Sequence, residues 1–264
     1  MKADRRVEEF VHFSENRSNR LVMNSIKQIQ IIGSAPNAHL ETCDFAYFAN
    51  YSLIGYNYDE VREKCGCVNV FAASTALFPE YFNYDNLKLE KLLHLRKKIL
   101  SFEPDEIIVF ASKKKHIPEL NKDKISYKIL FPENVAAFYI KAAGHSAPFW
   151  EWRSFIDDSR KSYLKALKIL KKTFIEYKKS DSRDNLHAYL RPSSGVTALA
   201  YAIKQHGAEA HYTLNGISFG ARVQHTVSQG FQKSRNSFEP HVVADKIFVE
   251  KSRSLGWKIS VNEA

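Results

Sequence analysis

The fold is decided at residues 191–203, which read Arg-Pro-Ser-Ser-Gly-Val-Thr-Ala-Leu-Ala-Tyr-Ala-Ile. Two hydroxyl residues and a glycine precede an apolar run, which predicts a helix that begins at Ser194. The start of a helix presents backbone N–H groups without intrahelical partners and the positive end of the helix dipole. Ser193, Ser194 and Gly195 are therefore either a plain N-cap or a binding site for a carboxylate or phosphate.

Strands and helices alternate on both sides of this stretch. Short apolar runs predict strands at residues 28–32, 45–49, 67–71, 106–110, 126–131 and 210–214, and a last strand ending at Val261. Helical periodicity predicts helices at residues 86–101 and 157–179, from Ser194, and over the stretch that His241 opens. This alternation is typical of an α/β protein with a Rossmann-like, doubly wound and mostly parallel sheet.

The chain length fits one domain. Its 264 residues predict a single domain, 1–264, with 44% hydrophobic residues for a core. Residues 220–240 are rich in Gly, Ser, Gln, Arg and Asn and have weak periodicity. They lie between two candidate site blocks, so we expect a small mobile lid there.

The first predicted strand ends in a turn of small residues, Gly33-Ser34-Ala35-Pro36-Asn37. Such turns open many nucleotide-binding α/β domains, in which ligands bind outside the carboxyl ends of the strands. The turn has neither the GxGxxG nor the Walker pattern, so turn geometry alone also accounts for its glycine. The second strand ends at Asn50, which brings an amide to the same edge.

Taken in order, these blocks resemble the bacterial sialyltransferase-like family, whose members use CMP-activated sugars. The family has a Gly-x-x-Pro turn, an asparagine after the second strand, a Ser/Thr-Ser-Gly helix start, a Gly-Ile-x-Phe strand end, and a histidine leading a helix with an acidic residue. The matching residues here are Gly33 to Pro36, Asn50, Ser193 to Gly195, Gly216 to Phe219, and His241 with Asp245. The blocks span residues 27–261.

The resemblance implies an inverting glycosyltransferase that moves sialic acid, or a related 2-keto sugar such as Kdo, from CMP to a surface-glycan acceptor. His241 suits a general base for the acceptor hydroxyl, because imidazole titrates near neutral pH, and Asp245 one turn later orients it. A histidine that only caps its helix is the alternative. The implied donor-binding residues are Gly33, Ser34, Ala35, Asn37, Asn50, Ser193, Ser194, Gly195, Gly216, Ile217 and Ser218.

Three departures from the family pattern bear on the donor sugar. Ser34 and Ser218 stand where the family commonly has asparagine and aspartate, and no tyrosine follows Tyr212 to hold the leaving phosphate. Arg222 and His225, in the predicted lid, are the candidates for that role. No Asp-x-Asp triplet is present, so we expect no metal and no cofactor, the CMP-sugar being the donor substrate.

The net charge of +10 indicates an anionic partner. Many of the positive charges lie in residues 157–179, where lysines alternate with leucine and isoleucine. This pattern fits a solvated helix face or a helix at an anionic membrane surface. Nucleic acid is disfavoured, because no recognised RNA-binding motif is present. A non-catalytic, basic nucleotide- or nucleic-acid-binding protein of the same fold class remains the alternative function.

The cysteines and the N-terminus predict a cytoplasmic protein, peripheral on the inner membrane if the basic helix binds lipid. Cys43, Cys65 and Cys67 have neither the even number of a disulfide framework nor partners at zinc-site spacing, which favours reduced structural thiols. The charged N-terminus leads into no apolar segment of a signal peptide, and no apolar run approaches the roughly 20 residues of a membrane span.

Overall fold

A seven-stranded sheet forms the centre of the computed structural model, which describes residues 26–33, 38–110, 127–144, 164, 166–171, 192–217 and 239–262. Every described pair of neighbouring strands is parallel, in the order β5-β4-β3-β2-β1-β6-β7. The strands are β1 (Lys27–Ile32), β2 (Cys43–Ala49), β3 (Cys65–Ala73), β4 (Glu106–Phe110), β5 (Tyr127–Leu130), β6 (Ala210–Asn215) and β7 (Lys258–Asn262). The predicted Rossmann-like α/β fold is confirmed, with a sheet that is parallel throughout.

The strand order contains one reversal. From β1 the chain steps outward through β2, β3 and β4 to β5, then returns to the other side of β1 with β6 and β7. The carboxyl ends of β1 and β6 therefore flank the topological switch point of the sheet. Open parallel sheets bind ligands in the crevice outside the strands at such a point.

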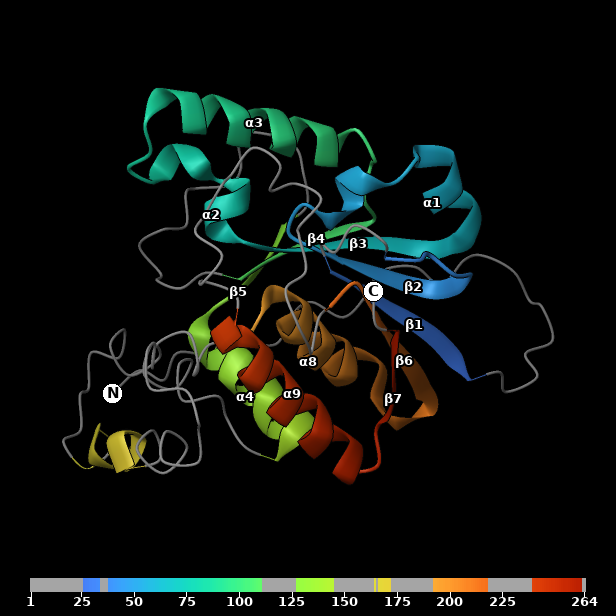
Figure 1. The fold of residues 1–264 in the computed structure, drawn as a ribbon, viewed down its shortest axis with the longest axis vertical. Helices are drawn as coiled ribbons and strands as arrows, with labels where there is room; N and C mark the ends of the chain where they lie inside the picture. Colours follow the sequence, from blue (N-terminus) through green and yellow to red (C-terminus); the bar gives the residue numbers. More distant parts are fainter. Residues whose placement is uncertain are drawn as a thin grey trace, which may run out of the picture.

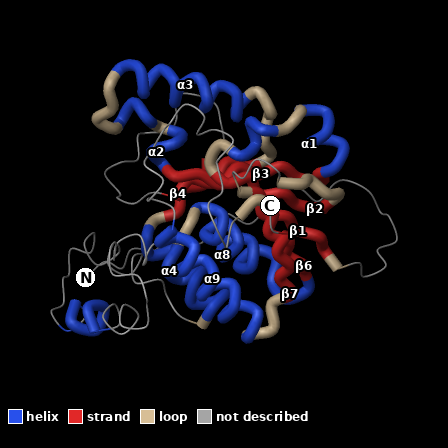
Figure 2. Tube along the Cα trace, in the orientation of Figure 1, coloured by secondary structure: helices blue, strands red, loops and turns tan. Residues whose placement is uncertain are grey.

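Helices cover the two faces of the sheet in two groups (Figure 1). One group lies above the sheet in that view: α1 (Tyr58–Lys64), α2 (Ser74–Leu77) and α3 (Asn86–Leu100), with the short helices η1 (Ser52–Gly55) and η2 (Pro79–Tyr81). The other lies below it: α4 (Pro132–Ala143), α8 (Ser194–His206) and α9 (Glu239–Ser254), with η5 (Gly207–Glu209). Figure 2 shows the same three layers by element type.

The alternation of strand residues divides the core between the two faces. Successive side chains point to opposite sides, so Ile31 packs in the core under α8, whereas Ile32 packs with Val61 of α1. Helix α8 is buried from Gly195 to Ile203, because it lies between the sheet and its neighbours α4 and α9. A helix buried on this scale has a fixed position, and so does its N-terminus.

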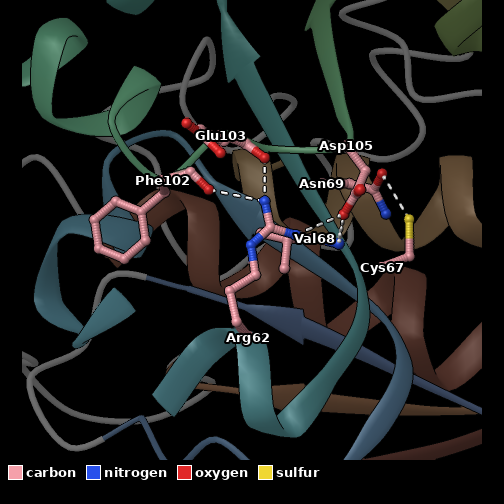
Figure 3. Close-up of polar contacts among 7 residues, drawn as sticks. All are labelled: Arg62, Cys67, Val68, Asn69, Phe102, Glu103 and Asp105. Atoms are coloured by element: carbon pink, nitrogen blue, oxygen red, sulfur yellow. Dashed lines mark hydrogen bonds and ion pairs between the residues drawn. The ribbon is translucent and has the colours of Figure 1, made fainter. Parts of the chain in front are cut away.

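Arg62 makes several polar contacts at the amino edge of the sheet (Figure 3). The Arg62 guanidinium contacts the Asp105 carboxylate at 3.1 Å and donates to the backbone carbonyls of Phe102, at 2.9 Å, and Glu103. The same Asp105 oxygen accepts the N–H of Val68 at 2.7 Å. We call these contacts the Arg62 clamp; they join α1, β3 and the turn between α3 and β4.

Two sequence predictions lie partly outside the described residues. In the predicted basic helix 157–179, residues 164 and 166–171 are described and helical. In the predicted lid 220–240, residues 220–238 are outside the description, and Glu239 and Pro240 belong to α9, so a lid would end earlier than predicted. Across the described part of the chain, no helix combines the length and apolarity that crossing a bilayer requires.

Candidate functional site

Four of the predicted site blocks meet at the carboxyl edge of the sheet. Helix α8 precedes β6 and α9 follows it, so both helices begin at this edge. Hydrogen bonds join Gly33 to Asn215, Asn50 to Ser194, and Ser193 to Asp245. Segments far apart in the sequence thus converge on the start of α8, beside the switch point.

The turn after β1 packs directly on the strand end after β6. The Gly33 N–H donates to the carbonyl of Asn215 at 2.8 Å, and Gly216 has the positive φ of 65° that favours glycine. A methyl group on Gly33 would lie 2.8 Å from the Gly216 carbonyl carbon, and one on Gly195 would lie 2.5 Å from Cδ1 of Ile217. The three glycines therefore allow three backbones to approach closely at the switch point.

Replacing Gly33 with alanine is expected to lower the free energy of unfolding by about 1–3 kcal/mol, since overpacking against immovable atoms costs that much. The new methyl group meets the backbone of Gly216 rather than a flexible side chain. Urea unfolding measures the loss. The matched control is Gly55→Ala, at a position where a methyl group meets nothing within 4 Å. Equal stability of the two variants would contradict the close packing inferred here.

Asn50 joins the ends of two strands to the start of α8. Its backbone has the left-handed φ of 52°, which asparagine tolerates better than most residues. Its Oδ1 accepts the N–H of Ala73 at 3.1 Å, and its Nδ2 donates to Oγ of Ser194 at 2.9 Å. A backbone N–H can only donate, so the orientation of the amide is fixed. Oγ of Ser194 is then an acceptor toward Asn50, and no described residue accepts its own proton.

Ser193 is the N-cap of α8. Its Oγ accepts the N–H of Val196 at 3.2 Å, and its carbonyl accepts the hydroxyl of Thr197 at 2.8 Å. The Tyr139 hydroxyl on α4 contacts the Thr197 hydroxyl at 3.0 Å, which ties the cap to a second helix. Because the cap satisfies Val196, the N–H groups of Ser194 and Gly195 are the ones that lack an acceptor within the helix. The cap is therefore Ser193, and the N–H groups that an anion could contact belong to Ser194 and Gly195.

Asp245 contacts the same cap from α9. Its Oδ1 accepts the Ser193 N–H at 2.8 Å, and the residue is 2% exposed. Burial raises the pKa of Asp245 to about 7, although the hydrogen bonds from Ser193 oppose the rise. The predicted partner of this carboxylate was His241, one turn earlier. The structure gives the carboxylate a contact to Ser193, 52 residues earlier in the chain.

His241 lies in the first turn of α9, which begins at Glu239, so it is not the N-cap residue. Its side chain, and the predicted donor-binding and phosphate-binding residues Ser34, Ala35, Asn37, Ser218, Arg222 and His225, are outside the described part of the structure. Their roles stay predictions. Gly33, Asn50, Ser193, Ser194, Gly195, Gly216 and Ile217 are described and lie at the carboxyl edge.

Sequence reasoning missed Asn215, the last residue of β6. Its side chain is buried, its Nδ2 donates to Oε1 of Gln30 at 3.2 Å, and its Oδ1 has no hydrogen-bond partner among the described residues. The signal was a polar residue that ends a strand immediately before a glycine at the switch point. An acceptor buried without a partner is uncommon and costly, so this amide is a further polar group at the site.

The described residues form no group of three His, Cys, Asp or Glu side chains that would hold a metal ion. The chain matches no protein-family model, no curated protein and no solved structure. The function is therefore argued from the arrangement of the site and from the resemblance in motif order.

Proposed function

We propose that the protein is an inverting, metal-independent glycosyltransferase that moves an acidic 2-keto sugar, sialic acid or a Kdo-like sugar, from CMP to a surface-glycan acceptor. The observation that carries this proposal is the bond from Asn50 to Ser194. It orients the Ser194 hydroxyl beside the two backbone N–H groups at the start of α8, and such a set of donors at the switch point of the sheet suits an anion. A CMP-sugar brings two anionic groups to such a site, the sugar carboxylate and the phosphate.

The proposed reaction is a single displacement at the anomeric carbon. The acceptor oxygen forms the new bond while the bond to the phosphate oxygen breaks, and CMP leaves with the electron pair. His241 takes the proton of the acceptor hydroxyl. Ser194 and Gly195 bind the sugar carboxylate or the phosphate, and the turn at Gly33 binds the cytidine ribose. Arg222 and His225 are proposed to balance the charge of the leaving phosphate.

The proposal predicts that CMP stabilises the fold. A ligand at a hundredfold excess over its dissociation constant adds about 2.7 kcal/mol, which raises the melting temperature of a domain of this size by about 5–10 °C. UMP and GMP are the controls. Ser194→Ala is expected to weaken CMP binding about tenfold to a hundredfold, because a hydrogen bond to a charged group is lost. Its melting temperature without ligand should fall by only about 2–4 °C, because Asn50 loses its acceptor at Ser194 while the cap at Ser193 remains.

A donor screen then separates enzyme from binding protein. CMP-sialic acid and CMP-Kdo are incubated with the protein, with and without excess EDTA, and released CMP is measured. CMP release that persists in EDTA supports the proposal. If EDTA abolishes CMP release and magnesium restores it, the reaction is not metal-independent as proposed. CMP binding without release from either donor favours the non-catalytic nucleotide-binding alternative. A melting curve that millimolar CMP, UMP and GMP all leave unchanged contradicts both.

We further propose that the helical residues 164 and 166–171 contact an anionic membrane surface, which would place the enzyme on the cytoplasmic face. Leu164, Leu167 and Leu170 are exposed by 70%, 44% and 51%, and Lys168 and Lys171 beside them are exposed. Apolar and basic side chains together favour an interface with anionic lipid.

Vesicle sedimentation tests the membrane contact. We expect binding to vesicles that contain phosphatidylglycerol, much weaker binding to phosphatidylcholine alone, and loss of binding in the triple variant Leu164→Ser, Leu167→Ser and Leu170→Ser. The control triple variant is Leu87→Ser, Tyr81→Ser and Leu255→Ser, at exposed apolar positions outside this helix. Equal sedimentation of both triple variants and the wild type would remove the proposed contact.

A further inference from the structure

The carboxylate of Asp245 is the most deeply buried acidic group that the structure describes at the site. It lies on α9 and is 2% exposed, yet its Oδ1 contacts the backbone of another helix, accepting the Ser193 N–H at 2.8 Å. The Ser193 side chain also lowers the pKa of this carboxylate. Ser193 is thus tied to Asp245 through its backbone N–H.

Ser193 in turn sets the direction of the first turn of α8. Its Oγ accepts from Val196 and its carbonyl accepts from Thr197, so the cap is held at three points, one of them on Asp245. The next residue, Ser194, carries the hydroxyl that Asn50 orients. A shift of Ser193 therefore moves the hydroxyl and the two N–H groups that face the proposed anion site.

A neutral side chain would accept the same hydrogen bonds at lower cost. Burial raises the pKa of Asp245 to about 7, which means that the ionised carboxylate is disfavoured in this position. A group that costs stability in a functional cleft commonly has a functional use. Here the negative charge lies beside the place where a second anion, the donor's carboxylate or phosphate, is proposed to bind.

We propose that Asp245 is a positioning residue for the anion site: it holds the Ser193 cap of α8, and it takes up a proton when the anionic donor binds. This inference rests on the proposed function. Two anions at one helix start repel each other, so ligand binding favours the protonated carboxyl. The effect is reciprocal, and protonation of Asp245 strengthens ligand binding by the same factor. Asp245 then acts on donor affinity and leaves the chemistry at His241 unaffected.

Among the titratable groups described near the cap, Asp245 is the one that contacts Ser193 directly. On α4, Tyr139 reaches the cap through Thr197. On α9, Lys246 and Glu250 are exposed, and His241 lies one turn earlier. On α8, Lys204 and His206 lie at the opposite end of the helix, and Lys258 begins β7 at the amino edge.

Three variants of the full chain test the inference. Asp245→Asn keeps an acceptor for the Ser193 N–H and removes the titration, Asp245→Ala removes both, and Glu250→Gln is the control at an exposed carboxylate of the same helix. Hydrogen exchange of residues 194–200, measured without ligand, reports the position of the cap. The CMP dissociation constant is measured from about pH 7 upward, where the phosphate charge is constant.

We expect Asp245→Ala to speed exchange at the start of α8 and to weaken CMP binding at least tenfold. Asp245→Asn should exchange no faster than the wild type, and Glu250→Gln should exchange like the wild type. Above pH 7 the wild-type dissociation constant should rise up to tenfold per pH unit, and that of Asp245→Asn should stay flat. If Asp245→Ala does not fold, the pH dependence of CMP binding in the wild type and in Asp245→Asn is sufficient to test the inference.

Three results overturn the inference. The first is exchange and CMP affinity in Asp245→Ala equal to the wild type, and the second is a pH dependence of CMP affinity that Asp245→Asn retains. The third is a fall in the turnover of Asp245→Asn at saturating donor with CMP affinity unchanged, which would show that Asp245 orients His241 instead. Failure of the proposed function is distinguishable: the wild type then binds no CMP, while the exchange measurement still decides whether Asp245 holds the cap.

Discussion

Replacing His241 with alanine is expected to lower turnover about a hundredfold to ten-thousandfold, the usual contribution of a general base. The affinity for CMP should change little, because the imidazole acts on the acceptor hydroxyl and makes no contact with the nucleotide in the proposed reaction. Turnover at saturating donor and acceptor, the CMP dissociation constant and the melting temperature are measured together. The base contributes only to the first of these three quantities.

The control for His241 is Lys246→Ala, an exposed position of the same helix. Loss of a helix cap costs about 1 kcal/mol, but α9 begins at Glu239, so alanine at position 241 removes no residue from the cap position. We therefore expect both variants to melt at the wild-type temperature. Unchanged turnover of His241→Ala would remove the proposed mechanism, whatever its effect on stability.

Replacing Asp245 with asparagine is expected to raise the free energy of unfolding by about 4 kcal/mol at about pH 8. The pKa of Asp245 is near 3.8 in the unfolded chain and about 7 in the folded protein. Between these values the folded state binds the proton more tightly, so wild-type stability falls as the pH rises from about 4 to about 7. Above this window the cost of the buried charge is fully present, and asparagine avoids it.

Urea unfolding of both proteins from about pH 4 to about pH 8 measures this difference. The two curves should converge at the acid end of the range and separate as the pH rises. Glu250→Gln, which removes an exposed carboxylate from the same helix, should follow the wild type throughout. A constant offset between Asp245→Asn and the wild type would show that the carboxyl does not titrate in this window.

The strands were predictable because their residues are buried on both faces. The run at Ile29 to Ile32 and the run at Glu106 to Phe110 are short, β-branched and apolar, and both form strands where expected. Helix α3 was also predicted, since Leu92, Leu95 and Ile99 recur at helical spacing on its buried side. These elements are determined by local pattern and burial.

Helices α1 and α4 were missed for opposite reasons. Helix α1, Tyr58–Lys64, is short and charged and buries only Val61, so periodicity gives little signal. Helix α4, Pro132–Ala143, exposes Ala137 and Ile140 on its open side, so its polar face is poorly marked in the sequence. Its start did carry a signal, a proline in the first turn preceded by Phe131, whose N–H is capped by the Asn134 side chain.

The site was predictable where topology determines it. Parallel strands end at one edge, so Asn50 after β2 and the helix start before β6 were both predicted to lie there, and a hydrogen bond of 2.9 Å joins them. The contact of Asp245 with Ser193 was not predicted, because helical spacing pointed to His241 four residues earlier, a pairing that stays a prediction. The contact to Ser193 depends on how α8 and α9 pack, which no local pattern records.

The Arg62 clamp has a consequence for the capacity of this scaffold to evolve. Its contacts are made entirely within the chain at the amino edge, whereas the candidate site is built from strand ends and helix starts at the carboxyl edge. Changes that retune a loop at the carboxyl edge therefore leave the clamp intact. A lineage with this fold can therefore change the ligands that it binds at one edge while the other edge keeps its architecture.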